Sequence, residues 1–335
     1  MGEGLYISDA EIVVDGGEGL RTHALTEGAM LAAITVLIAL MGRYISFMSF
    51  ILPVPLGILV YRHGLRSGIL VSVTSSFLVA ITLSNLLFSV QVLIIGVLGI
   101  ALGMGLRESF HFAQLLLVGV VSSVITFLLQ IFVYSLLFGE NLLTLAFEMW
   151  EKGLTQSLEF YQDLGFSPEL IAESEEQVLI MVELLRTAIP LSLVMGGFLF
   201  TLVNLGVIRF ILRRLGDTSI PWLPPFSTWQ WPWYFVYGII FGLSFSVLSL
   251  YTTSEIWHII AINLYFFFLY AFVIQGFAII WFYLNTYNVN KILRIILIFL
   301  IIQSGNFFSI AIAFFGIFDT WFDFRKLKKG NETEV

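Results

Sequence analysis

Residues 112–138 read FAQLLLVGVVSSVITFLLQIFVYSLLF, a run of 27 residues without a charged side chain. About 20 mostly apolar residues suffice to cross the roughly 30 Å hydrocarbon core of a bilayer as an α-helix. Inside the hydrocarbon no water is available to the backbone, so the segment must satisfy its own hydrogen bonds as a helix. This run therefore predicts a transmembrane helix.

Similar runs recur along the chain and predict an all-α, polytopic helical membrane protein with eight or nine transmembrane helices. Eight spans are expected at residues 25–42, 45–61, 67–87, 90–106, 112–138, 187–208, 233–251 and 257–284. A last apolar segment, residues 292–318, is long for one untilted span. We expect it to be a ninth span; the alternative is a break at Ser304-Gly305-Asn306 that folds it back, since glycine and asparagine weaken a helix interior.

The composition agrees with a membrane protein and excludes several functions. Of the 335 residues, 59% are hydrophobic and 12% are charged, and the mean hydropathy is +0.95. A soluble chain could not remove that much apolar surface from water. The chain has no cysteine, which excludes disulfides, thiolate nucleophiles and cysteine metal sites.

Motifs for catalysis are also missing from the sequence. It contains no GxxxxGK[ST] phosphate loop and no HExxH zinc motif, and its four histidines are isolated. Almost no ionisable residue falls inside a predicted span, which argues against a carrier that moves protons or other charges through the membrane. We therefore expect no enzyme, no cofactor, no metal site and no nucleic-acid partner.

Basic residues in the loops indicate the orientation of the chain in its membrane. The N-terminal segment is acidic, unlike a secretory signal, and we expect it to remain in the cytoplasm. That placement puts eight basic loop residues inside and three outside, in agreement with the positive-inside rule. The inner set is Arg62, Arg66, Arg107, Arg209, Arg213, Arg214, Lys291 and Arg294, and the outer set is Arg43, Lys152 and Arg186.

This topology divides the chain into five parts. They are an acidic cytoplasmic tail (1–22), a five-helix membrane half (23–138), an extracytoplasmic insert (139–186), a second membrane half (187–325) with an interfacial loop at 216–234, and a polar tail (326–335).

The insert is expected to be an acidic helical hairpin. Apolar residues from Leu143 to Tyr161 recur at spacings of three and four, which predicts an amphipathic helix. Ser167-Pro168-Glu169 has the residue types of an N-cap, a first-turn proline and a first-turn acid, and so predicts the start of a second helix. The hairpin is either a lid over an outward-facing cavity or a connector that lies on the membrane surface.

The loop at 216–234 is rich in tryptophan and proline. Prolines exclude a continuous helix here, and tryptophan at this density is typical of the membrane interface. The alternative is a surface for a partner protein, with Trp229 and Trp231 as candidate docking residues.

A neutral polar stripe in the third and fourth spans provides the candidate ligand-binding residues. They are Ser72, Ser75, Thr82, Asn85 and Gln91. Small polar residues in spans more often bond to neighbouring helices or to their own backbone, so helix packing is the alternative. Small residues at Gly96, Gly99 and Gly103, and at Ala29 and Ala33, also predict faces where helices approach closely.

Three stretches carry a family resemblance. With TEGAMLAAITVL (26–37), PVPLGILVYRHGLRSGIL (53–70) and FGIFDTWFDFRK (315–326), the chain resembles the YybS family of bacterial inner-membrane proteins. The resemblance runs from about Thr22 to Arg325 and implies no particular activity.

The part from Ala24 to about Phe138 is also similar to the S components of energy-coupling-factor vitamin transporters, which are shorter, six-span proteins. In them, small alanines of the first helix dock the membrane coupling subunit, and the matching residues here are Ala29, Ala32 and Ala33. The acidic hairpin and the last spans have no counterpart in that family. The C-terminal Asp319, Asp323 and Arg325 are either docking residues or stabilisers of the last helix end.

Two functions follow as expectations. The first is non-enzymatic binding or transport of a small, vitamin-like or neutral polar solute, with a membrane coupling subunit as partner. The second is a scaffold or regulatory protein that transports nothing and binds an envelope protein through its tryptophan-rich loop and basic tail.

Overall fold

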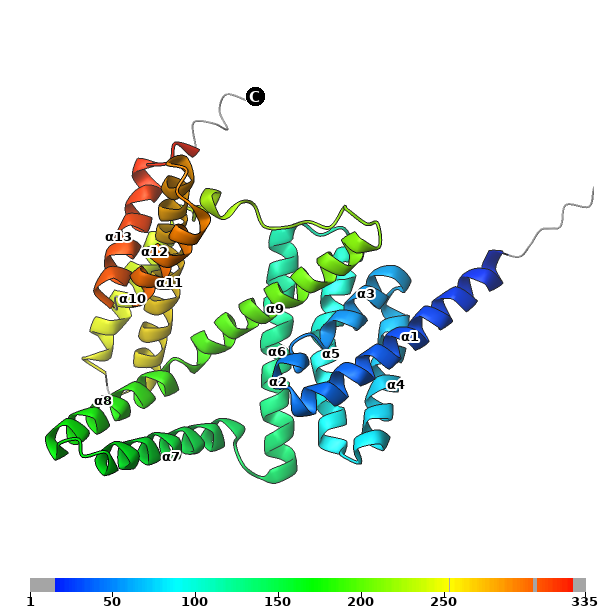
Figure 1. Ribbon diagram of the computed structural model, residues 1–335, viewed down its shortest axis with the longest axis horizontal. Coiled ribbons are helices and arrows are strands. Elements are labelled where there is room, and N and C mark those ends of the chain that lie inside the picture. The colour runs from blue at the N-terminus through cyan, green and yellow to red at the C-terminus, as the bar shows by residue number, and fades with distance from the viewer. Residues whose placement is uncertain (1–15, 253, 304–305, 328–335) are drawn as a thin grey trace, which may run out of the picture. The chain divides into compact units, whose positions relative to one another are not determined.

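The computed structural model describes residues 16–252, 254–303 and 306–327, and every regular element in these ranges is helical (Figure 1). The elements are α1 (Gly16–Tyr44), α2 (Ser46–Ser49), α3 (Pro53–His63), α4 (Leu65–Leu83), α5 (Leu86–Arg107), α6 (Phe112–Phe138), α7 (Leu142–Asp163), α8 (Pro168–Thr187), α9 (Ile189–Arg214), η1 (Phe226–Thr228), α10 (Phe235–Ser249), α11 (Glu255–Thr286), α12 (Lys291–Gln303) and α13 (Asn306–Phe322). The predicted all-α fold is confirmed.

Six helices in the described ranges are long and apolar enough to cross a membrane. They are the part of α1 from Leu25 to Tyr44, and α4, α5, α6, α9 and α11. Each corresponds to a predicted span, and α6 begins and ends at the residues expected, 112 and 138. The tails predicted at 1–22 and 326–335 fall mostly outside the described residues, although α1 already begins at Gly16.

The predicted spans 45–61 and 233–251 differ from the structure, because each contains only a shorter helix. The first is divided into α2 and α3, and α3 begins at Pro53, where a proline fits the first turn but ends the preceding helix. Its 11 residues rise only about 16 Å, roughly half of the hydrocarbon thickness. The second contains α10, which has 15 residues.

The last apolar segment is also divided, into α12 and α13, whereas a single crossing was expected. The start of α12 lies beside the end of α11, because Arg294 donates to the side chain of Asn285 and to the backbone oxygen of Val289. The end of α13 lies there too, since Tyr283 Oη donates to the Phe324 oxygen at 3.1 Å. The segment therefore folds back on itself. Residues 304 and 305 of the predicted break lie outside the described residues.

The chain forms two compact units. Unit 1 contains residues 1–130 and 197–220, and unit 2 contains residues 131–196 and 221–335. Most of α9 therefore belongs with the N-terminal helices, which it joins through Asn204: its Nδ2 donates to the Phe50 oxygen at 2.9 Å.

Unit 1 is built around α3, whose residues Pro53 to Val60 are all buried. Its neighbour α5 carries Gly99 and Gly103 at the contact, where an added Cβ would meet the backbone oxygens of Pro53 and Gly57. The two backbones can approach this closely only because these positions lack a side chain. The short α3 is thus the centre of unit 1.

In unit 2, α11 packs against α10 and α13. Gly276 on α11 and Gly316 on α13 lie at their crossing, where an added Cβ would meet the Ile312 and Phe272 oxygens. The predicted hairpin is present as α7 and α8, with Asn141 and Ser167 as N-caps and Pro168 in the first turn. Arg186 and Glu151 form an exposed ion pair between them, at 2.6 Å.

Candidate functional site

Ser72 and Ser75 of the predicted stripe are buried on one face of α4 in unit 1. Ser75 Oγ donates to the Ala32 oxygen on α1 at 3.5 Å, so it connects two helices. Ser72 Oγ faces Gly96 on α5 and has no hydrogen-bond partner among the described residues. Buried hydroxyls are usually bonded, so Ser72 is the member of the stripe with unused capacity.

The other three stripe residues have separate local partners. Thr82 Oγ1 donates to the oxygen of Leu78, in its own helix, at 2.8 Å. Asn85 is the N-cap of α5 and accepts from the Phe88 amide at 2.9 Å. Gln91 Nε2 donates to Gln130 Oε1 at 3.4 Å. Ligand binding by these residues stays a prediction.

The alanines of α1 point in different directions. Ala32 is buried, whereas Ala29 and Ala33, one turn apart, are exposed on the outer face of the helix. A neighbouring helix could therefore approach α1 at these two positions without displacing a side chain of unit 1.

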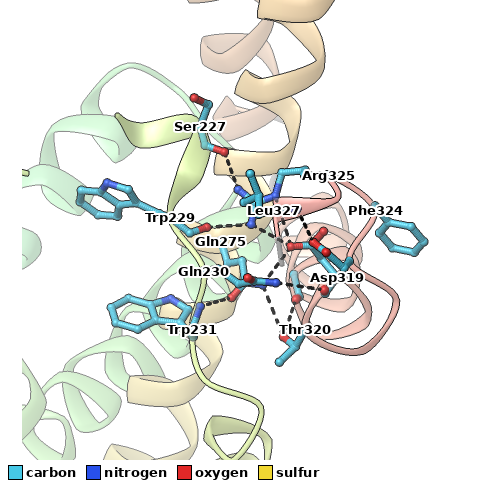
Figure 2. Close-up of polar contacts among 12 residues, drawn as sticks. Ser227, Trp229, Gln230, Trp231, Gln275, Asp319, Thr320, Phe324, Arg325 and Leu327 are labelled. Carbon is cyan, nitrogen blue, oxygen red and sulfur yellow. Dashed lines mark hydrogen bonds and ion pairs between the residues drawn. The ribbon is translucent and has the colours of Figure 1, made fainter. Parts of the chain in front are cut away.

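Asp319 and Arg325 form a buried ion pair in unit 2 (Figure 2). Arg325 Nη2 lies 2.7 Å from Asp319 Oδ2, and both side chains have 0% exposure. Arg325 also donates to two backbone oxygens of the tryptophan-rich loop, from Nη1 to Ser227 at 2.6 Å and from Nη2 to Trp229 at 2.8 Å. One guanidinium thus joins the end of α13 to the loop.

Gln275 on α11 completes this cluster of polar groups. Its Oε1 accepts from the Trp231 amide at 2.8 Å, and its Nε2 donates to Asp319 Oδ2 at 3.3 Å. The Trp231 indole donates to the Ala271 oxygen at 2.7 Å. Residues far apart in sequence therefore meet on α11, as Figure 2 shows for Gln275, Trp231 and Asp319.

This geometry places Asp319 and Arg325 inside unit 2, whereas docking by the C-terminal candidates stays a prediction. Asp319 and Arg325 pair with each other and are buried, which agrees with the alternative that they stabilise the end of the last helix. Asp323 accepts from the Leu327 amide at 2.9 Å and shapes the turn after α13. Trp229 and Trp231 are partly buried, whereas Trp222 (37%) and Trp233 (55%) are exposed.

The cluster is structural in character, with one unused group. Asp319 Oδ1 is buried without a hydrogen-bond partner among the described residues. No group of three or more histidine, aspartate or glutamate side chains that could hold a metal ion occurs in the described part of the chain. A carboxylate neutralised by a guanidinium is a poor general base. The arrangement therefore favours a structural role, in which Arg325 holds the loop against α13, over catalysis.

A second buried cluster, at one end of α1 and α3 in unit 1, was missed by sequence reasoning. Glu27 is 8% exposed; it accepts from Arg62 Nη1, and its Oε2 lies 2.7 Å from His63 Nε2. Sequence separations of 35 and 36 residues leave no periodic signal. Glu27 and Asp319 are thus two buried carboxylates near the ends of apolar helices. Their burial could not be predicted from the positions of charged residues along the sequence.

Comparison with known proteins places the chain among predicted membrane proteins. A family model described as "Predicted membrane protein (DUF2232)" matches residues 30–320. The uncharacterized protein YybS of Bacillus subtilis (strain 168) is 28% identical over 324 residues, which cover 92% of this chain and 99% of that protein. No solved structure matches the chain.

Proposed function

The chain belongs to the DUF2232 family of predicted membrane proteins, and on that premise we propose that it is a non-enzymatic binding protein of the S-component kind. In this proposal, unit 1 holds a small polar solute and α1 docks a second membrane protein. Unit 1 draws on six stretches of helix: α1, the α2–α3 pair, α4, α5, α6 and α9. The S components that the sequence resembles are likewise six-span proteins.

The observation that carries the proposal is the alanine face of α1. Ala29 and Ala33 are exposed together, while Ala32 faces inward beside Ser75. Small side chains let two helices pack at short distance in a membrane, where van der Waals contact replaces the hydrophobic driving force. These are the positions that dock the coupling subunit in the proteins that the sequence resembles.

Ser72 is the favoured contact for the solute. Its hydroxyl is buried and unpartnered among the described residues, and Ser75 lies one turn away on the same helix face. A neutral ligand with hydrogen-bonding groups would use this capacity without bringing a charge into the membrane. Thr82, Asn85 and Gln91 contribute less in this proposal, because each has a local partner.

Site-specific cross-linking tests the docking step. Since the chain has no cysteine, single cysteines at Ala29, Ala33 and Ala113 can each carry a photo-cross-linker. Ala113 is an exposed alanine on α6 and serves as the matched control. We expect Ala29→Cys and Ala33→Cys to attach to the same membrane protein in native membranes, and Ala113→Cys not to. Identical products at all three positions, or no protein product at 29 and 33, would contradict docking through α1.

The scaffold function is a second candidate, because Arg325 bonds to the backbone of the loop and two tryptophans of the loop are exposed. In that case Trp222 and Trp233 would contact the partner, rather than Trp229 and Trp231, whose indoles donate to backbone oxygens within unit 2. A cross-linker at Trp233→Cys distinguishes the two candidates. A protein product from residue 233 alone would favour the scaffold.

A further inference from the structure

A cavity of about 470 Å³ lies at one end of α3 and α9 in unit 1, and its lining includes neither Ser72 nor Ala29. Its volume falls within the range of about 300–1,000 Å³ that is common for small-molecule sites. It is lined by Tyr61, Arg62, Leu212, Leu215 and Gly216 to Ser219. The cavity therefore combines one cation, one anion, hydroxyls and an apolar wall.

The turn after α9 forms one wall of this cavity. Gly216 has a φ of 97°, a conformation that favours glycine, and lets the chain leave the helix. The Asp217 amide then donates to the Leu212 oxygen at 3.0 Å and the Gly216 amide to the Arg213 oxygen at 3.2 Å. These two bonds close the helix end and fix the position of Asp217 against α3.

Asp217 is an ionised carboxylate that forms no ion pair with a basic side chain in the described part of the chain. Its Oδ1 accepts from Ser219, from the hydroxyl at 2.6 Å and the amide at 3.0 Å, and its Oδ2 accepts from the Tyr61 hydroxyl. The Ser219 hydroxyl, followed by that of Tyr61, lowers the pKa of Asp217 below its usual value. The ion pairs of the described residues do not include Asp217.

Arg62 supplies the opposite charge at the same cavity. It donates to Glu27 through Nη1, and its side chain remains 40% exposed. A guanidinium has five N–H donors in a planar fork that suits phosphate oxygens, so a single contact to Glu27 leaves donors for a ligand. The pair of charges matches a ligand that carries a phosphate and an amine on one short linker.

The location identifies the source of such a ligand. Leu212 and Leu215 stand at the end of α9, an apolar helix of 26 residues that is long enough to cross a membrane, so the cavity lies near headgroup depth. We propose that this cavity binds the phosphoethanolamine headgroup of a membrane lipid, with the phosphate at Arg62, the primary ammonium at Asp217 and the glycerol end along Leu212 and Leu215.

The carboxylate makes the site selective among lipids. Phosphatidylglycerol has a phosphate but no cation for Asp217, so its headgroup leaves that carboxylate unpaired beside a negative ligand. Phosphatidylcholine has a cation without N–H donors and cannot hydrogen-bond to the carboxylate. The expected order of binding is therefore phosphatidylethanolamine, then phosphatidylcholine, then phosphatidylglycerol.

Native mass spectrometry of the delipidated full chain with an equimolar mixture of these three lipids, matched in acyl chains, tests the proposal. We expect Asp217→Asn to lower retention of phosphatidylethanolamine about tenfold, the loss that corresponds to one charge-assisted hydrogen bond. The matched control is Asp163→Asn, which changes an exposed acid at the end of α7 and should leave retention unchanged. Equal retention by Asp217→Asn, or a preference of the native chain for phosphatidylglycerol, would overturn the proposal.

A second variant and a competitor complete the test. Leu215→Trp places a larger side chain in the cavity from an exposed position and removes no polar group. It should lower retention of phosphatidylethanolamine, and it tests the site even if Asp217→Asn folds poorly. Full retention in a folded Leu215→Trp chain would also count against the site. Displacement of the lipid by excess free phosphoethanolamine would assign the same chemistry to a soluble ligand, whereas retention assigns it to the lipid.

Discussion

Arg325→Met is expected to lower the free energy of unfolding by about 3–5 kcal/mol, because it leaves the Asp319 carboxylate buried without its partner. The substitution also removes the donors that hold the Ser227 and Trp229 oxygens. Unfolding of the detergent-solubilised chain, followed by tryptophan fluorescence, measures the loss. Hydrogen exchange at the Trp229 and Trp231 amides should increase as the loop separates from α11 and α13.

Two controls separate the buried pair from charge in general. Arg186→Met breaks the exposed pair with Glu151 and should cost no more than about 1 kcal/mol, as exposed ion pairs usually do. Combining Arg325→Met with Asp319→Leu removes both buried charges and should recover much of the stability. If Arg325→Met lowered the free energy of unfolding no more than Arg186→Met does, the buried pair would not stabilise the contact between the loop and α13.

Gly99→Ala is expected to destabilise unit 1 by about 3 kcal/mol, at the upper end of the usual cost of overpacking a core. The added methyl group would meet the carbonyl oxygen of Pro53, and backbone at the start of α3 cannot rotate away as a side chain can. This cost opposes the gain of about 1 kcal/mol that alanine brings to a helix interior.

Gly153→Ala provides the matched control for Gly99→Ala. Gly153 also lies inside a helix, α7, but nothing lies within 4 Å of a Cβ placed there. Thermal unfolding of the two variants should therefore shift in opposite directions. A stabilised Gly99→Ala chain would show that α3 and α5 are farther apart than the structure has them.

The long helices could be predicted from sequence because each carries its own signal. The uncharged run at 112–138 corresponds to α6 residue for residue, and Ser167-Pro168 marks the start of α8. The length, hydropathy and capping residues of a helix are properties of one continuous segment, so they can be predicted without knowledge of tertiary contacts. A local signal also accounts for the division of the segment 45–61 into two helices, because Pro53 cannot continue a preceding helix.

The polar sites could not be predicted in the same way, because their members come from distant parts of the chain. Gln275 meets Trp231 and Asp319 across 44 residues in each direction, and Tyr61 meets Asp217 across 156. Hydropathy places Asp319 and Arg325 at a helix end, where exposure and burial are equally compatible with the sequence. From the sequence, Asp319 and Arg325 are therefore candidate site residues for which both a docking role and a helix-end role are open.

By itself, the sequence determined that the chain is an all-α membrane protein, where its long helices lie, and that Ala29 and Ala33 share one face of the first. Only the tertiary structure decided which charges are buried, that α9 packs with the N-terminal helices, and that a cavity joins Arg62 to Asp217. The physical reason is that apolar length and helix caps act within a few residues. Burial of a charge depends on which distant groups can pair with it, and that is settled only when the helices pack.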